Sequence, residues 1–212
     1  DISSIVLKKS PFPEISAKDL AGQIESRRSA EKKLPTWFNT PGIYFPSKLS
    51  IEQTSSEITA RYKADLAKGK KLIDLTGGFG VDSYFFSKKA ELVTHCEVNS
   101  DLSAIAQHNA KVLNEENVNF INADGIEYLK TSTETFDTIY IDPSRRKNAQ
   151  KVFLLSDCEP NVVEHFNLLL SKAQRIIIKT SPLLDIQSGL RELRNVSRIY
   201  IVSVNNDCKE LL

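Results

Sequence analysis

The sequence predicts an α/β fold in which a mostly parallel β-sheet is covered by helices on both faces and preceded by a small helical extension. Two observations lead to this prediction. From Lys71 onward, short apolar runs alternate with amphipathic helical segments, a pattern typical of parallel strands buried on both sides. A glycine-rich segment, 77–80, directly follows the first apolar run, as expected where a strand turns into a helix. With 212 residues, 41% of them hydrophobic, the chain is long enough for one sizeable core.

The first 70 residues are predicted to lie outside the sheet. Residues 16–33 carry apolar side chains at helical spacing opposite a charged face, and the proline-rich stretch 35–46 predicts an extended linker. A second helix is expected over 50–68, with Ser50 as its N-cap and Gly69 as its stop. The expected buried stripe of this helix is Ile51, Ile58, Tyr62 and Leu66.

Six parallel strands are predicted from Lys71 onward, at 71–75, 91–97, 117–121, 137–142, 174–180 and 198–204. Helices are expected between them, near 81–89, 100–114, 124–130, 159–171 and 184–193, with Pro160 in the first turn of its helix. After the sixth strand, the turn residues Asn205-Asn206-Asp207 predict a returning antiparallel strand that is cut short. The chain begins at Asp1 and contains no methionine, so we expect a fragment. It would comprise an N-terminal extension and linker, 1–48, and a sheet domain, 49–212, whose C-terminal part is missing.

The strongest local signal is the segment DLTGGFGVD, which starts at Asp74 and includes Thr76. Glycine at 78 and 80 would allow the backbone to pass close to a ligand. A dinucleotide site would have a third glycine near Asp82, where a carboxylate would repel a pyrophosphate but tolerate a cationic group. Asp74 could serve the same cationic group. The alternative is a tight strand-to-helix turn without a ligand; a nicotinamide-dependent oxidoreductase is disfavoured.

Acidic residues also follow the second and third predicted strands. Glu97 lies 23 positions beyond Asp74, close to the offset at which a carboxylate meets the ribose hydroxyls of a nucleotide. Asp124 is placed to accept a hydrogen bond from an adenine amino group. Each acid alone could be a helix cap or a turn residue, but together with the glycine loop they predict a nucleoside-containing ligand at one edge of the sheet.

The fourth strand ends in Asp142-Pro143-Ser144-Arg145-Arg146. Its first two residues resemble the Asp/Asn-Pro-Pro-aromatic motif of methyltransferases that act on amino groups of bases, in which the acid accepts hydrogen bonds from the target amine. Ser144, Arg145 and Arg146 replace the remainder, so an arginine would have to stack on the base or bind a substrate phosphate. The alternative is a solvated basic loop.

The fifth strand is followed by Lys179-Thr180-Ser181-Pro182, and Lys179 is a further candidate for substrate binding. Pyrimidine C5-methyltransferases place a nucleophilic cysteine in this position. Because no cysteine is present at 179–182, covalent attack on a pyrimidine is disfavoured and direct in-line transfer is expected.

These segments, with SIEQTSSEITARYKADL (50–66), together resemble a bacterial family of class I S-adenosylmethionine (SAM)-dependent methyltransferases that carry a THUMP-like domain. The resemblance covers about residues 45–212. The glycine loop is also similar to that of a 16S ribosomal RNA guanine-N2 methyltransferase family, with Gly77 in place of alanine. The resemblance implies a Rossmann-like sheet and RNA as the substrate. It further implies SAM-binding roles for Asp74, Gly78, Gly80, Glu97 and Asp124, and acceptor-facing roles for Asp142 and Pro143.

We therefore expect a cytoplasmic RNA methyltransferase that transfers a methyl group to a base nitrogen. The rivals are a methyltransferase acting on DNA, protein or a small molecule, and a non-catalytic RNA-binding scaffold of the same fold. The net charge of +1 gives no global argument for nucleic acid. No apolar run is long enough for a membrane span, and the three cysteines and three histidines form no metal-ligand pattern.

Overall fold

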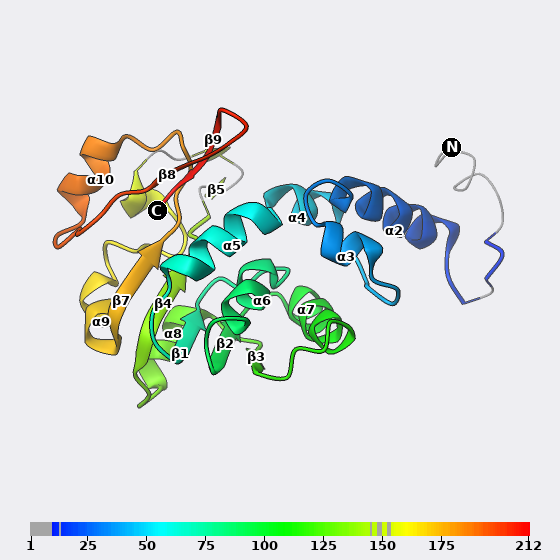
Figure 1. The fold of residues 1–212 in the computed structure, drawn as a ribbon, viewed down its shortest axis with the longest axis horizontal. Coiled ribbons are helices and arrows are strands. Elements are labelled where there is room, and N and C mark those ends of the chain that lie inside the picture. The colour runs from blue at the N-terminus through cyan, green and yellow to red at the C-terminus, as the bar shows by residue number, and fades with distance from the viewer. Residues whose placement is uncertain (1–9, 13, 145, 148–149, 152–153) are drawn as a thin grey trace.

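The structure, a computed structural model, describes residues 10–12, 14–144, 146–147, 150–151 and 154–212. Its centre is a parallel five-stranded sheet with the strand order β3-β2-β1-β4-β7 (Figure 1). The strands are β1 (Lys71–Asp74), β2 (Leu92–Cys96), β3 (Val118–Ile121), β4 (Phe136–Ile141) and β7 (Ala173–Ile178). Five of the six predicted strands are thus confirmed, because the buried apolar runs fix their positions.

Each face of the sheet is covered by helices. Along β1 and β4, Leu72 and Tyr140 belong to one buried cluster, whereas Ile73 and Ile139 belong to the other. Such alternation buries both faces of a strand. The first cluster includes side chains of α5 (Glu57–Leu66) and α6 (Val81–Ser87), and α7 (Ser100–Val112) packs against it. The second includes side chains of α8 (Gly125–Thr131) and α9 (Phe166–Lys172), with α10 (Ile186–Glu192) and η1 (Leu155–Asp157) nearby.

The sixth predicted strand does not join the parallel sheet. β8 (Ile201–Val204) pairs antiparallel with β9 (Asp207–Leu211), and one bridge, between Thr180 and Leu211, links this hairpin to the segment after β7 in the described part of the chain. Asn205 and Asn206 both have positive φ, 54° and 61°, which forms a two-residue turn that can join only antiparallel neighbours. The prediction of a sixth parallel strand was therefore wrong. The expected returning antiparallel strand is present as β9, which pairs along the whole of β8.

The helix predicted over 50–68 is interrupted. It consists of α4 (Lys48–Gln53) and α5, because Ser56 caps α5 by accepting a hydrogen bond from the N–H of Thr59. The predicted buried stripe was partly wrong: Ile51 is buried, but Ile58 and Tyr62 are 62% and 39% exposed.

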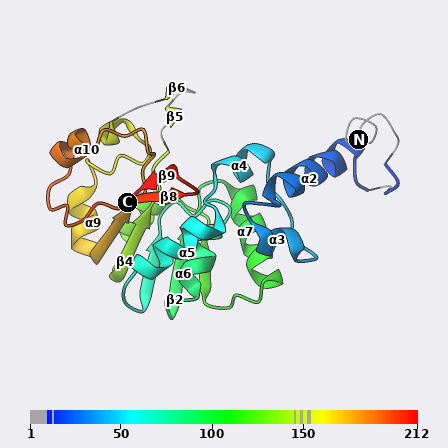
Figure 2. The ribbon, with the colours of Figure 1, turned by 45° about the horizontal axis from the view of Figure 1, so that its top comes forward.

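The N-terminal helices α2 (Ala17–Ala30), α3 (Pro35–Asn39) and α4 pack against one another. α3 lies beside α7, whereas α2 lies farther from the sheet (Figures 1 and 2). α3 falls in the stretch predicted to be irregular, and Pro35 occupies its first turn, where a missing N–H costs nothing. Trp37 of α3 is 1% exposed and contacts the rings of Phe79, Tyr84 and Phe85. Residues before and after position 48 therefore share one buried cluster.

The helix expected over 159–171 begins only at Phe166. Glu159 instead pairs through its backbone with Ser144, and the Glu159–Pro160 peptide bond is cis. Pro160 therefore lies in a loop. The prediction that it occupies the first turn of the helix was wrong. Among the described residues, no helix is both long and apolar enough to span a membrane.

Candidate functional site

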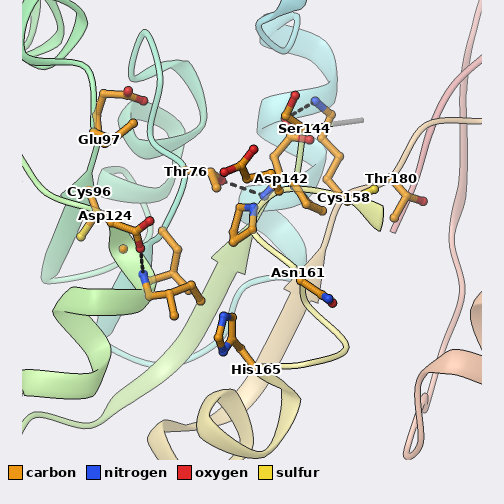
Figure 3. Close-up of a pocket in the computed structure, with 18 of the residues that line it drawn as sticks. Thr76, Cys96, Glu97, Asp124, Asp142, Ser144, Cys158, Asn161, His165 and Thr180 are labelled. Carbon is orange, nitrogen blue, oxygen red and sulfur yellow. Dashed lines mark hydrogen bonds and ion pairs between the residues drawn. The ribbon is translucent and has the colours of Figure 1, made fainter. Parts of the chain in front are cut away.

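A cavity of about 1070 Å³ lies at the carboxyl ends of the parallel strands. Strand order reverses between β1 and β4, and such a switch point is where open α/β sheets bind ligands. Figure 3 shows Cys96, Glu97 and Asp124 on one side of this cavity and Asp142, Ser144, Cys158 and Thr180 on the other. The predicted residues that line it are Thr76, Glu97, Asp124, Asp142, Pro143, Ser144 and Lys179.

The end of β2 holds the glycine loop in place. Glu97 accepts hydrogen bonds from the backbone N–H of Gly78, at 2.9 Å, and of Asn99, at 2.8 Å. Gly78 has φ +55°, a conformation that favours glycine. The carboxylate thus lies at the cavity wall in an orientation fixed by two backbone donors.

Asp124 caps the helix that follows β3. Its Oδ1 accepts from the N–H groups of Ile126, at 2.8 Å, and Glu127, at 3.1 Å. Gly125 lets the start of α8 pass close to the end of β1, because a Cβ at this position would lie 2.4 Å from the carbonyl oxygen of Leu75. Among the described residues, Oδ2 of Asp124 has no hydrogen-bond partner, and Asp124 lines the cavity.

Asp74 and Asp82 do not line the cavity. Asp74 is 1% exposed and accepts hydrogen bonds from the Ser83 hydroxyl, at 2.7 Å, and the Thr76 N–H, at 3.1 Å. Burial, and to a smaller extent the Asp82 carboxylate, raises the pKa of Asp74 to about 7. The sequence predicts contact of both carboxylates with a cationic ligand, whereas in the structure both have protein partners outside the cavity lining.

The Asp82 carboxylate belongs to a buried charge cluster formed by Lys63, Asp82 and Glu210. Lys63 has no exposed side-chain surface and lies 2.9 Å from Asp82 Oδ1 and 3.2 Å from Glu210 Oε2. Asp82 Oδ2 also accepts from Ser55, at 2.7 Å, and Tyr140, at 3.0 Å. The cluster joins α5, α6 and β9, which are distant in sequence, so no local motif could have indicated it.

Gly80 also lies away from the cavity lining. Its φ is +86°, and a Cβ there would lie 3.3 Å from that of Ala106 on α7. The glycine therefore permits close packing of the loop against α7, in addition to the left-handed backbone that starts α6.

Asp142 connects β1, β4 and β7 at the switch point. Its backbone N–H donates to the Thr76 hydroxyl, at 2.7 Å, and its Oδ2 accepts from the Lys179 ammonium, at 2.5 Å. Burial lowers the pKa of Lys179, but the carboxylates of Asp142, Asp82 and Glu210 outweigh it and raise this pKa above its ordinary value. The ammonium is therefore charged across the physiological pH range.

The segment after Asp142 is fixed by backbone pairing. Pro143 is buried, and Ser144 exchanges two backbone hydrogen bonds with Glu159, at 2.7 and 2.9 Å. Arg145 lies outside the described residues. Arg146 contributes backbone to β5 (Arg146–Lys147), which pairs with β6 (Gln150–Lys151), but its side chain is not described. The predicted substrate contacts of both arginines stay predictions.

Several lining residues were not predicted. Cys96 is the last residue of β2, Cys158, Asn161 and His165 come from the segment that leads into α9, and Glu52 and Gln53 end α4. The loop residues follow no strand end and so gave no signal. The α4 residues were expected in the first turn of a continuous helix over 50–68, although Ser55-Ser56 offered a capping signal for a new helix there.

No known family model matches the chain. It is 33% identical over 134 residues to an uncharacterized RNA methyltransferase of Mycoplasma mobile, covering 61% of this chain and 36% of that protein. It is 30% identical over 149 residues to the 23S rRNA (uracil(747)-C(5))-methyltransferase of Pyrococcus abyssi, covering 63% and 35% respectively.

Among solved structures, a Porphyromonas gingivalis W83 protein assigned as a methyltransferase superposes with a TM-score of 0.88 and 33% sequence identity. The match covers all of this chain and 53% of that protein. The chain thus spans about a third of the curated relatives' length and about half of the structural relative's. The chain has the mostly parallel α/β fold of class I methyltransferases.

Proposed function

We propose that this chain is the catalytic part of a SAM-dependent methyltransferase that transfers a methyl group to a base nitrogen of RNA by direct in-line displacement. One observation carries the proposal: polar groups from β1, β2, β3, β4 and β7 meet in one cavity at the switch point of a methyltransferase fold. The two curated relatives, both named as RNA methyltransferases, support RNA over DNA, protein or a small molecule.

The residues on the β1–β3 side fit SAM. The carboxylates of Glu97, Asp124 and Glu127 line this side, and SAM carries a net positive charge from its sulfonium and ammonium groups. Glu97 would accept from the ribose hydroxyls, Asp124 from the adenine amino group, and Thr76 would lie against the ligand. Gly78, which does not line the cavity, would orient the Glu97 carboxylate through its backbone N–H. SAM supplies a methyl group already activated for transfer.

Residues that do not reach the cavity would act through others. Asp74 and Asp82 hold Thr76, Ser83 and Tyr140, so we assign them to positioning and not to contact with the methionyl end. Gly80 would set the path of the loop by packing on α7.

The acceptor would bind on the β4–β7 side. Asp142, held by Thr76 and Lys179, would accept a hydrogen bond from the target nitrogen and orient it, with Pro143 and Ser144 forming the adjacent wall. Arg145 and Arg146 would bind a phosphate of the RNA backbone. Residues 1–48 would form the extension that brings α4 to the site, and the remainder of a longer protein would carry the THUMP-like domain.

Carbon 5 of uracil is a second candidate acceptor. The Pyrococcus abyssi relative is named for this reaction, and Cys158 lines the cavity although residues 179–182 include no thiol. Product analysis by nucleoside mass spectrometry separates the candidates, since 5-methyluridine differs in retention from any N-methylated nucleoside.

Calorimetric titration with SAM, and separately with NAD, tests the cofactor class. We expect micromolar SAM binding that weakens about tenfold in Glu97→Ala, equivalent to the loss of one charge-assisted hydrogen bond. Glu91→Ala is the matched control, because Glu91 precedes the opposite end of β2 and its side chain is 69% exposed. Binding of NAD, or equal SAM affinity in both variants, would contradict the proposal. Full absence of SAM binding would favour the alternative function, a non-catalytic RNA-binding scaffold of the same fold.

A further inference from the structure

The Lys179–Asp142 pair leaves hydrogen-bonding capacity directed at the cavity. A lysine ammonium has three donors, and within the described part of the chain Asp142 is its one side-chain partner. Asp142 in turn uses only Oδ2, and Oδ1 has no partner among the described residues. The two side chains are 14% and 34% exposed, and both line the cavity. A largely buried ammonium with unused donors is costly unless a ligand supplies an acceptor.

From this geometry we infer that the acceptor is a lactam, a ring N–H beside a carbonyl, as in guanine (N1–H, O6) or uracil (N3–H, O4). This inference rests on the proposed function and specifies its substrate. The ring N–H would donate to Asp142 Oδ1, and the carbonyl would accept from Lys179. Because the two side chains touch each other at 2.5 Å, they suit two groups on adjacent atoms of one ring.

Charge distinguishes a lactam from the amino bases adenine and cytosine. An amino nitrogen that is methylated before losing its proton develops positive charge, which the nearby ammonium would destabilise. A lactam develops negative charge on its oxygen as the N–H proton leaves, and the same ammonium would stabilise that charge. Lys179 thus favours the lactam because its pKa is raised and it stays charged.

The step balances with the groups named. The ring nitrogen gives its proton to Asp142 and forms the new N–C bond, while the bond from the methyl carbon to the donor sulfur breaks and its electron pair stays on sulfur. The carbonyl of the product is restored, and Asp142 then releases its proton to water.

A bound phosphate is a less suitable partner for Lys179. Glu159 and Glu164 line the same side of the cavity, and the Asp142 carboxylate lies in direct contact with the ammonium. A phosphate would therefore bind beside several carboxylates, whereas a neutral lactam satisfies the donor and the acceptor together.

Saturation-transfer NMR in the presence of S-adenosylhomocysteine tests recognition without turnover. The probes are guanosine, uridine, adenosine, cytidine and 1-methylguanosine. We expect a stronger saturation-transfer signal for guanosine or uridine than for adenosine and cytidine. The comparison of guanosine with uridine then identifies the base. If guanosine is the ligand, 1-methylguanosine should give a weaker saturation-transfer signal, because it lacks the ring N1–H. Equal saturation of all probes, or stronger saturation of adenosine, would overturn the inference.

Lys179→Met should weaken lactam binding about tenfold and leave S-adenosylhomocysteine affinity within about twofold. Lys89→Met, which removes a lysine paired with exposed Asp65, is the matched control and should change neither. If Lys179→Met does not fold, the comparison among probes in the unaltered protein still decides the question.

Product analysis on transcribed ribosomal RNA with isotope-labelled SAM is the second arm. Label in 1-methylguanosine or 3-methyluridine would support the inference. Label in N6-methyladenosine, N4-methylcytidine or 5-methyluridine would overturn it while leaving RNA methylation intact. Absence of SAM binding would instead refute the proposed function, and the lactam inference with it.

Discussion

Lys63 is buried between two carboxylates, and Lys63→Met measures what that arrangement contributes to stability. Methionine keeps the length of the side chain but removes the charge, leaving Asp82 and Glu210 with side chains 11% and 3% exposed. Removing one partner of a buried ion pair costs about 3–5 kcal/mol. Burial, despite the opposing effect of Lys63, raises the pKa of Glu210, which can therefore take up a proton and reduce the penalty. We expect a loss of about 3 kcal/mol, at the lower end of that range.

Urea unfolding at neutral pH is the assay, followed by the fluorescence of Trp37, the single tryptophan, which is 1% exposed when folded. Lys70→Met is the control, because Lys70 and Glu91 pair with side chains 76% and 69% exposed and should contribute less than about 1 kcal/mol. In the double variant with Glu210→Gln, the two losses should couple by about 1–3 kcal/mol. A loss below about 1 kcal/mol in Lys63→Met, with no coupling, would refute the reasoning.

Three further predictions concern stability and are checked by the same unfolding assay. The folded-state pKa of Asp74, about 7, lies above its unfolded value, so its contribution is present below about pH 4 and is lost as pH rises through 7. The difference in stability between Asp74→Asn and the unaltered protein should therefore shift in favour of the variant between about pH 5 and 8, and a constant difference would contradict this. Gly77→Ala should lower the free energy of unfolding by about 1–3 kcal/mol, because its Cβ would lie 2.1 Å from the His95 ring. Gly22→Ala, with nothing within 4 Å of its Cβ, should raise the free energy of unfolding by about 0.5–1 kcal/mol inside α2. Equal effects of the two variants would contradict this packing. Ile58→Lys should change the free energy of unfolding by less than about 0.5 kcal/mol, since this side chain is 62% exposed. A large loss would instead indicate that Ile58 is buried, as the sequence predicts.

The parts of the fold that were predicted correctly depend on local pattern. The five central strands are short buried runs, and α7 has an Asn99 cap and one apolar face, so nearby residues specify each element. The errors arose where a distant contact decided the outcome. α5 faces the core with Lys63 and not with Ile58, because Asp82 and Glu210 neutralise the lysine, and neither partner can be located from the α5 sequence.

The candidate site divides in the same way. Strand-end residues such as Glu97, Asp124 and Asp142 could be identified because the carboxyl ends of parallel strands converge on one edge. Asp74 also ends a strand, but its side chain points to Ser83 and away from the cavity, and strand-end position alone does not give that direction. The pairing of Lys179 with Asp142 required the neighbouring registers of β4 and β7, which no sequence motif encodes.

Gly77 shows how a departure from a motif can have a structural cause outside the motif. The glycine loop is similar to one in which alanine occupies this position, and a ligand-based explanation would attribute the glycine to space for the ligand. The structure gives a different reason, because the space is filled by the His95 ring. This ring is fully buried, lies 4.9 Å from the Phe120 ring at an interplanar angle of 50° and contacts the Ser83 hydroxyl through Nδ1 at 3.0 Å. Burial lowers the pKa of His95 to about 3, so the ring is neutral and packs as an uncharged group. The identity of residue 77 is therefore coupled to that of residue 95, and an alanine at 77 should be compatible with a smaller side chain on β2.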